Sequence, residues 1–278
     1  MEKAGQRLMA TQDYGWSQIA ARAGLAWPAA VPWAMQRAVQ AGFAAWEPFL
    51  KTSADARRIG QQAVDHGLAM PSIFVAGALF DVDQGAATSA RIMEVVAEAV
   101  RFGCERVTIY PEPKQGSAKS DGELSLQAQN LNRLAEALSG VSLLYHPEEP
   151  EMADGAYEYH QVLTHTDPNL VRLCLDPDAI WRGAALSEPL KLDLVRQYAD
   201  RTDAIHLRQS VNGVWAEVIG AGDMPLSDIA ALTKEFNPHL VVEHAYEAGT
   251  PRTLDPVEAH RQSIAFARAL FDNGGGNP

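Results

Sequence analysis

From about residue 40 onward the sequence repeats one unit. A helical stretch with a single apolar face is followed by a glycine, proline or asparagine, then by a short apolar run, and then by a cluster of polar residues. This repetition narrows the fold more than any other property of the chain, because helices alternating with short strands are typical of βα units around a parallel sheet. Near-continuous apolar runs suit strands that are covered on both faces.

Helices are predicted from the spacing of apolar residues. Ile92, Val95, Val96 and Ala99 lie on one face of a helix, after candidate caps at 88–89 and before a glycine. The same reasoning predicts helices at 53–66, 121–139, 189–199, 226–236 and 255–271. Strands are predicted at 8–12, 43–47, 68–75, 106–110, 141–145, 171–175, 204–207 and 240–243.

Eight strands in 278 residues match the size of a (β/α)₈ TIM barrel, which needs roughly 250 residues. We therefore expect an α/β fold with a single TIM-barrel domain over 1–278, in which 273–278 form a frayed tail. A Rossmann-type sheet is the rival fold. It would need a glycine-rich turn after the first strand, and residues 13–24 contain no GxGxxG motif.

Composition excludes several classes of protein. No run approaches the roughly eighteen apolar residues of a membrane-spanning helix, and the first residues lack a basic segment followed by an apolar run, so a cytoplasmic protein is expected. With 35 acidic against 23 basic residues, the chain is not expected to bind nucleic acid. Cys104 and Cys174 lie in strand-like runs and are expected to be buried thiols.

Two segments interrupt the repeat and are predicted to be loops on the catalytic face of a barrel. Residues 14–33 carry Trp16, Trp27 and Trp33, and residues 209–225 carry Trp215. These tryptophans would either line a sugar-sized pocket or pack the loops down, and the sequence leaves both interpretations open.

Ionisable residues follow most of the predicted strands, where the active face of a barrel must lie. They are Glu47, Glu112, His146, Glu148, Glu149, Glu151, Asp176, Asp178, His206, Arg208, Glu243 and His244. Converging carboxylates and imidazoles suit a divalent cation such as Mn²⁺, Mg²⁺, Co²⁺ or Zn²⁺. Two glutamates across such an ion can also remove and return a proton beside a carbonyl.

Five short motifs occur in order: YHPEEPE (145–151), LCLDPD (173–178), AIHLRQS (204–210), GAGDMPL (220–226) and LVVEH (240–244). Over about residues 40–270 the chain resembles the xylose-isomerase-like TIM barrels, which include sugar isomerases and epimerases, hydroxypyruvate isomerase, inosose dehydratase and endonuclease IV. The resemblance implies four metal ligands, namely Glu148 (or Glu151), Asp176, His206 and Glu243. It further implies that Glu148 and Glu243 are catalytic and that His146 belongs to an inosose-dehydratase-like Tyr-His-Pro-His motif, in which Glu148 replaces the second histidine.

The chain also departs from this family pattern. Ala179 stands where members often carry a histidine, and a common His-Leu-Lys-Asp has become His206-Leu207-Arg208-Gln209. These changes indicate either a different substrate or a site that no longer binds metal or turns over. Arg208 keeps a positive charge and could hold a substrate oxygen or carboxylate with two parallel hydrogen bonds.

Each candidate has a structural interpretation beside the functional one. An acid that closes the run LVV is costly unless it is paired or ligating, which favours function for Glu243. Asp176 could simply open a turn, whereas strand alternation points His206 into the barrel lumen. Glu148 and Glu151 lie in a run that could be a solvated loop, and Glu47 is expected only to face substrate.

The leading hypothesis is a divalent-metal-dependent isomerase, epimerase or dehydratase acting on a small sugar or polyol. The second is a metal-free, non-catalytic barrel that binds carbohydrate or serves in an assembly, motivated by Ala179 and Gln209. The third, a nuclease of the endonuclease IV kind, ranks last because basic residues and extra histidines are lacking. No membrane partner is expected, and a homo-oligomer is one expectation because barrels of this kind often pair.

Overall fold

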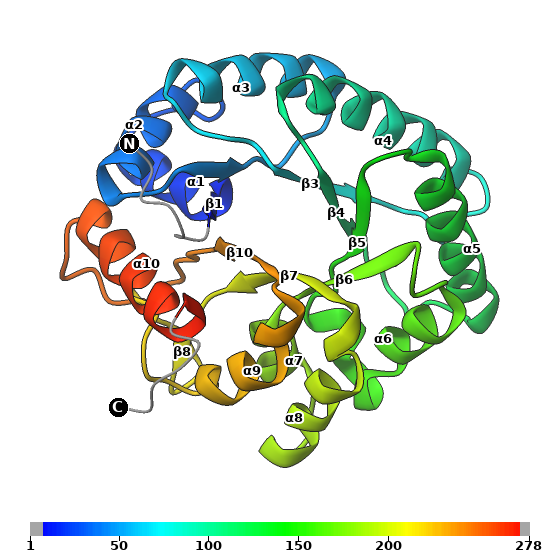
Figure 1. Ribbon diagram of the computed structural model, residues 1–278. Helices are drawn as coiled ribbons and strands as arrows, with labels where there is room; N and C mark the ends of the chain where they lie inside the picture. The colour runs from blue at the N-terminus through cyan, green and yellow to red at the C-terminus, as the bar shows by residue number, and fades with distance from the viewer. Residues whose placement is uncertain (1–7, 273–278) are drawn as a thin grey trace.

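The computed structural model describes residues 8–272 and shows a ring of parallel strands inside a ring of helices (Figure 1). Eight strands form one sheet in the order β2-β1-β10-β7-β6-β5-β4-β3, as expected for a (β/α)₈ TIM barrel. The strands are β1 (Met9–Gln12), β2 (Ala45–Glu47), β3 (Ser72–Gly77), β4 (Arg106–Pro111), β5 (Ser142–Tyr145), β6 (Val171–Leu175), β7 (Thr202–Leu207) and β10 (His239–Val242). The predicted tail at 273–278 lies outside the described residues.

The barrel closes between β2 and β3 through isolated bridges instead of a continuous ladder. Ala45 pairs with Ala69 and Phe49 pairs with Phe74, both in the parallel sense. Backbone amides across this seam donate to carbonyls at 2.8–2.9 Å, as Leu50 does to Phe74. The strand predicted at 68–75 is therefore two pieces, because Pro71 has no N–H to contribute to a ladder.

The predicted helices are present with ends shifted by a few residues. The helices that follow the second and later strands are α3 (Ser53–Asp65), α4 (Gly85–Ala99), α5 (Asp121–Ala137), α6 (Ala153–His165), α7 (Pro177–Gly183), α8 (Glu188–Gln197), α9 (Leu226–Thr233) and α10 (Pro256–Asp272). Their ends have clear chemical causes: Ser120 and Glu123 form a capping box at the start of α5. Within residues 8–272, no helix is both long enough and apolar enough to cross a membrane.

The prediction that 14–33 is a loop was wrong for most of that segment. Helix α1 (Asp13–Arg22) starts directly after β1, capped by the side chain of Gln12, and α2 (Val31–Ala41) has a proline in its first turn. Trp16, Ile19 and Ala20 occupy one buried face of α1, a short helical pattern that the nearby prolines and tryptophans obscured. By contrast, 209–225 is a loop that contains a small hairpin of β8 (Ser210–Val211) and β9 (Val214–Trp215).

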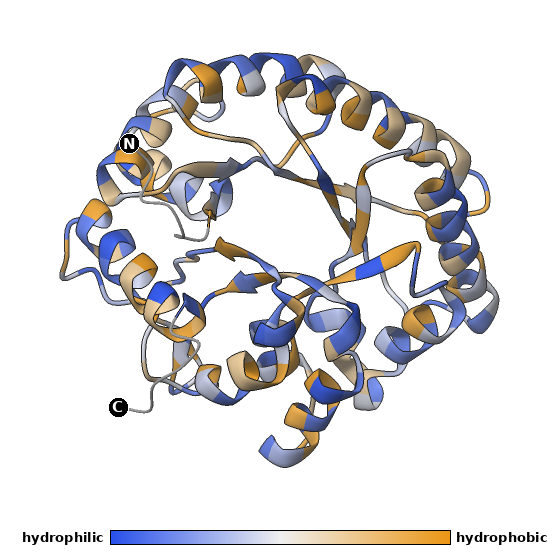
Figure 2. Ribbon diagram, in the orientation of Figure 1, coloured by the Kyte–Doolittle hydropathy of each residue, from blue (hydrophilic) through white to orange (hydrophobic). Residues whose placement is uncertain are grey.

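The core has an outer and an inner part. One large cluster of buried apolar side chains fills the space between strands and helices, and Figure 2 shows helices that carry both hydrophilic and hydrophobic residues. Two small separate clusters come from alternate strand positions, Ala10 with Ala45 and Val241, and Leu144 with Cys174 and Ala204. Strand alternation assigns these to the lumen, so the residues two positions further along also point inward.

A stack of three buried rings fastens α1 to α10 beside the barrel. The ring of His260 lies 4.0 Å from that of Trp16 on one side and 4.0 Å from that of His244 on the other. His260 is 1% exposed, and its Nε2 lacks a hydrogen-bond partner among the described residues. Burial therefore lowers the pKa of His260 from 6.5 to about 4.

Replacing His260 with Phe should flatten the pH dependence of stability between pH 6.5 and about 4. In that window the unfolded chain takes up a proton that the folded chain excludes, so the wild type loses stability as the pH falls. The difference should approach about 3 kcal/mol at the acid end. Urea unfolding at several pH values measures it, and the exposed His165→Phe variant is the control. Equal slopes for wild type and His260→Phe would contradict this assignment.

Candidate functional site

The inward-facing positions at the carboxyl ends of the strands carry the polar residues that the sequence singled out. Each lies two residues beyond a lumen-facing apolar residue or directly after its strand. Glu47 ends β2, and the others follow β5, β6, β7 and β10 or end β7. They are Glu47, His146, Asp176, His206 and Glu243, with exposed fractions between 0 and 5%. The fold thus brings together most of the candidate residues from five strands.

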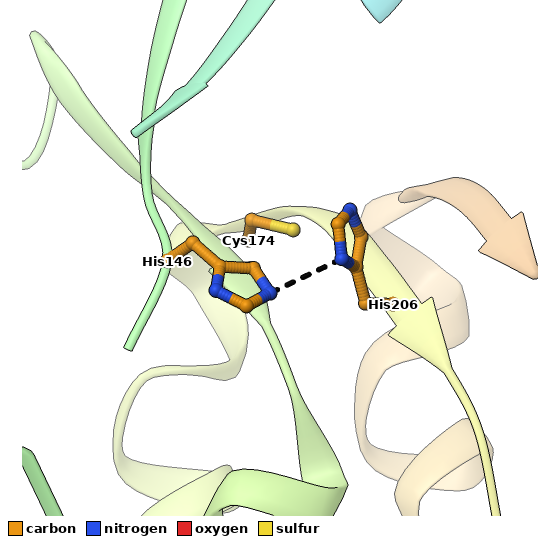
Figure 3. A group of neighbouring side chains, drawn as sticks. All are labelled: His146, Cys174 and His206. Atoms are coloured by element: carbon orange, nitrogen blue, oxygen red, sulfur yellow. Dashed lines mark hydrogen bonds between the residues drawn. The ribbon is translucent and has the colours of Figure 1, made fainter. Parts of the chain in front are cut away.

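His206 lies at the centre of this group. Its Nε2 is 2.8 Å from Oε1 of Glu47, and its Nδ1 is 2.7 Å from Oε2 of Glu243. Nδ1 also lies 3.1 Å from Nε2 of His146, and Figure 3 shows the two rings converging with Cys174 from neighbouring strands. Burial lowers the pKa of His206, but Cys174, Glu47 and Glu243 raise it by more, to well above its ordinary value.

Arg208 holds the carboxylates on the opposite side of the site. One terminal nitrogen of its guanidinium lies 2.5 Å from Oδ2 of Asp176 and 3.5 Å from Oε1 of Glu243. The same nitrogen lies 3.7 Å from Oε2 of Glu148. Arg208 is 6% exposed, so these contacts form in a nearly water-free environment where charge pairing is strong.

Asp176 serves both of the roles that the sequence left open. Its Oδ1 accepts hydrogen bonds from the backbone amides of Asp178 and Ala179, at 2.8 and 3.4 Å, and so caps α7. Its Oδ2 faces Arg208 and lies 3.8 Å from Nε2 of His146. The turn-opening and functional interpretations therefore apply to different oxygens of one carboxylate.

Glu148 and Glu243 differ in their proton affinity. Burial raises the pKa of Glu148 to about 8, assisted by the negative charges of Asp176 and Glu243 and opposed by Arg208. Burial also acts on Glu243, but Arg208 and His206 outweigh it and lower that pKa to about 2. Near neutral pH, Glu148 therefore holds a proton and Glu243 is ionised.

Glu151 lies apart from this group. Its carboxylate accepts a hydrogen bond from the amide of Glu148 at 2.8 Å and lies 3.9 Å from Nζ of Lys119. It lines a second, smaller cavity of about 290 Å³ together with Glu158 and Lys119. Of the two glutamates weighed as a strand-five ligand, Glu148 is the one beside Arg208.

A cavity of about 890 Å³ opens above the strand ends and has Glu148, Arg208 and Glu243 in its wall. This volume suits a small organic molecule. Glu47, His146, Asp176 and His206 lie beneath its surface, so Glu47, predicted to face substrate, instead supports His206. Aromatic rings also line the cavity, from Tyr14, Trp27, Phe49, Phe74, Tyr110 and Trp215.

The tryptophans divide between the two interpretations. Trp16 is fully buried, and Trp33 packs against the outer core. Trp27 and Trp215 line the cavity, and the indole N–H of Trp215 donates to Oδ2 of Asp178 at 2.9 Å. One aromatic residue from each interrupting segment therefore reaches the site.

Asp13 is a cavity-lining acid that the sequence reasoning missed. It follows β1 directly, is 4% exposed, and has its pKa raised to about 8 by burial and by the charges of Glu47 and Glu243. The rule that ionisable residues follow strands would have found it. It was overlooked because 14–33 was interpreted as a loop and the strand was ended at Gln12.

The described residues include two groups of three side chains whose ligand atoms lie within 4.8 Å of one another: His146 with Cys174 and His206, and His146 with Asp176 and Glu243. Such spacing is compatible with a metal ion. However, Arg208 already lies within 4 Å of Glu148, Asp176 and Glu243. Two cations cannot share this position, so the present arrangement does not fit a divalent ion at the predicted ligands.

Comparisons with known proteins agree with this fold and site. Residues 35–270 match the xylose isomerase-like TIM barrel family, and the chain belongs to that family. An inosose dehydratase of Geobacillus kaustophilus (strain HTA426) is 31% identical over 100 residues, which are 35% of this chain and 31% of that relative. The match therefore spans about a third of either protein.

Two solved structures are similar in fold. A sugar phosphate isomerase/epimerase from Parabacteroides distasonis has a TM-score of 0.75 at 17% identity, over 98% of this chain and 96% of that one. The apo 3-keto-D-glucoside 4-epimerase of E. coli has a TM-score of 0.67 at 14% identity, over 95% and 100% of the two chains. At these identities the likeness supports the fold alone.

Replacing Asp176 with Ala should destabilise the protein by about 3 kcal/mol, because it removes a helix cap and one partner of a buried charge. The Thr52→Ala variant is the matched control, since Thr52 caps α3 at an exposed position with no ion pair to a buried arginine. That control should lose only about 1 kcal/mol. Urea unfolding measures both, and equal losses would contradict the buried pair of Asp176 and Arg208.

Proposed function

We propose that this protein is an isomerase, epimerase or dehydratase that moves a proton next to a carbonyl group of a small sugar or polyol. The observation that carries the proposal is the pair Glu148 and Glu243 in the wall of a single cavity, each with an oxygen within 4 Å of Arg208. Two carboxylates with opposed proton affinities around a fixed cation provide the base, the acid and the charge stabilisation that such a reaction requires.

The chemistry follows from the protonation of these groups. Ionised Glu243 takes the proton from the carbon beside the carbonyl, and the electron pair of the broken C–H bond moves to the carbonyl oxygen. The negative charge that develops there is stabilised by N–H donors of Arg208. Protonated Glu148 then supplies a proton, and His206, held between Glu47 and Glu243, keeps the base in position.

The three reactions differ only in where the second proton goes. Return to the opposite face of the same carbon inverts its configuration, and delivery to the former carbonyl carbon moves the carbonyl along the chain. Protonation of a neighbouring hydroxyl releases water. The shared first step is why the same residues serve an isomerase, an epimerase or a dehydratase.

A metal-dependent form of the same reaction is the second candidate. The close approach of His146, Asp176 and Glu243, within 4.8 Å, favours it. A bound Mn²⁺, Mg²⁺, Co²⁺ or Zn²⁺ would supply Lewis-acid polarisation of the carbonyl. Arg208 would then have to leave the carboxylates that it now contacts.

The other hypotheses receive less support from the site. A non-catalytic carbohydrate-binding or assembly barrel would not need buried acids with such different pKa values, since perturbed groups cluster at catalytic sites. A DNA-repair nuclease needs cations to meet the phosphates, whereas the cavity wall carries Asp13, Glu112, Glu148 and Glu243 around Arg208.

Replacing Glu243 or Glu148 with Gln should lower kcat/KM by about 10²- to 10⁴-fold, because each variant removes a proton-transfer group. A panel of keto sugars and inososes, with and without phosphate, is assayed for new products by NMR. Glu149→Gln is the matched control: it makes the same change in the same cavity wall, but Glu149 pairs with Arg182 at 2.8 Å.

The control should keep its activity within a few-fold. Activity of Glu243→Gln equal to that of the control would refute the role of Glu243. If the wild type turned over no member of the panel but bound one or more of them, the carbohydrate-binding hypothesis would replace the present proposal.

A further inference from the structure

The guanidinium of Arg208 occupies the point on which the family's predicted metal ligands converge. Three of the four predicted ligands, Glu148, Asp176 and Glu243, place a carboxylate oxygen within 4 Å of one of its terminal nitrogens. A side chain at the rim would approach one of them. Contact with all three, from the ends of three different strands, places the positive charge at their centre.

The fourth predicted ligand is also engaged. A histidine binds a metal through a nitrogen lone pair that no other group occupies. The two ring nitrogens of His206 instead lie 2.8 Å from Glu47 and 2.7 Å from Glu243. Binding an ion through either nitrogen would require that pairing to break.

Further contacts fix the guanidinium where it is. Its Nε lies 3.8 Å from Oδ2 of Asp178, and its carbon lies 5.6 Å from the centre of the Trp215 ring. Asp178 is in turn bonded to the indole N–H of Trp215. Arg208 is thus held from the β6 end, the β10 end and the 209–225 loop at once, so its charge is part of the built site.

We propose that Arg208 takes the place of a divalent ion in this chain, so that the site works with a guanidinium as its internal cation and does not bind a metal at the predicted ligands. The catalytic consequence rests on the proposed function: the N–H groups of Arg208 receive the oxyanion that forms when Glu243 removes the proton. Guanidinium is always charged and offers planar paired donors, which suits an oxygen of a carbonyl or enediolate.

The proposal makes a specific demand on the variant that lacks the charge. Arg208→Met leaves Glu148, Asp176 and Glu243 facing each other, and a divalent ion then relieves their repulsion. Removing a unit charge about 4 Å from a divalent ion is worth several kcal/mol at an effective dielectric of about 20, so Co²⁺ should bind at least about a hundredfold more tightly than to the wild type.

Co²⁺ titration followed by its visible absorption, with elemental analysis after dialysis, measures this without any substrate. Arg182→Met is the matched control, because Arg182 also contacts Asp178 and the Trp215 ring but lies at the rim of the cavity. The expected result is binding by Arg208→Met and no comparable binding by the wild type, by Arg208→Lys or by Arg182→Met. Circular dichroism confirms that each variant is folded.

Two results would overturn the proposal. One equivalent of tightly bound Co²⁺ in the wild type would show that Arg208 does not replace the ion, even if Arg208→Met fails to fold. A folded Arg208→Met variant that binds no Co²⁺ would show that its guanidinium does not occupy an ion position. Lack of turnover with every sugar would count against the proposed function alone, because the cobalt titration needs no substrate.

Discussion

The site is organised by a buried positive charge surrounded by carboxylates from several strands. An arginine with 6% exposure is tolerable in the interior only when negative groups compensate it, and Arg208 has Asp176, Glu243 and Glu148 within 4 Å. The same contacts divide the acids into two kinds. Glu243, which also bonds His206, is held ionised, whereas burial dominates at Glu148 and keeps its proton on.

The barrel makes this arrangement possible by filling its lumen with small side chains below the site. Ala10, Ala45 and Ala204 leave little volume in the middle of the barrel, and the inward positions two residues later carry the polar groups. Helices and loops then wall off a cavity over the strand ends, with Trp27 and Trp215 contributed by the two segments that interrupt the repeat. Stability and chemistry are thus separated along each strand, as the barrel architecture allows.

Much of the fold was predictable because apolar periodicity is a local property. The eight strands and most helices could be read from spacing and end signals, and the positions of His206 and Glu243 followed from strand alternation. Helix α1 was missed because only three of its residues, Trp16, Ile19 and Ala20, show the buried face within a segment rich in proline and tryptophan.

The site was less predictable, because contacts between side chains from different strands are not written in any one motif. Sequence gave Arg208 a role toward substrate, but could not show that its nearest partners are the predicted metal ligands. Nor could it show that Glu47 faces His206, or that Glu151 caps a turn beside Lys119. The order of motifs indicates the family, whereas the departures from the motifs acquire meaning only in three dimensions.

The central claim is that a carboxylate of this site removes a proton from carbon, and solvent exchange tests it most directly. Keto sugars and inososes are incubated with the enzyme in D₂O, and the C–H signal beside the carbonyl is followed by ¹H NMR. We predict that at least one compound loses that signal through deuterium incorporation with the wild type, and keeps it with Glu243→Gln. Turnover of a sugar without any exchange of that hydrogen, or exchange that persists in Glu243→Gln, would contradict the account.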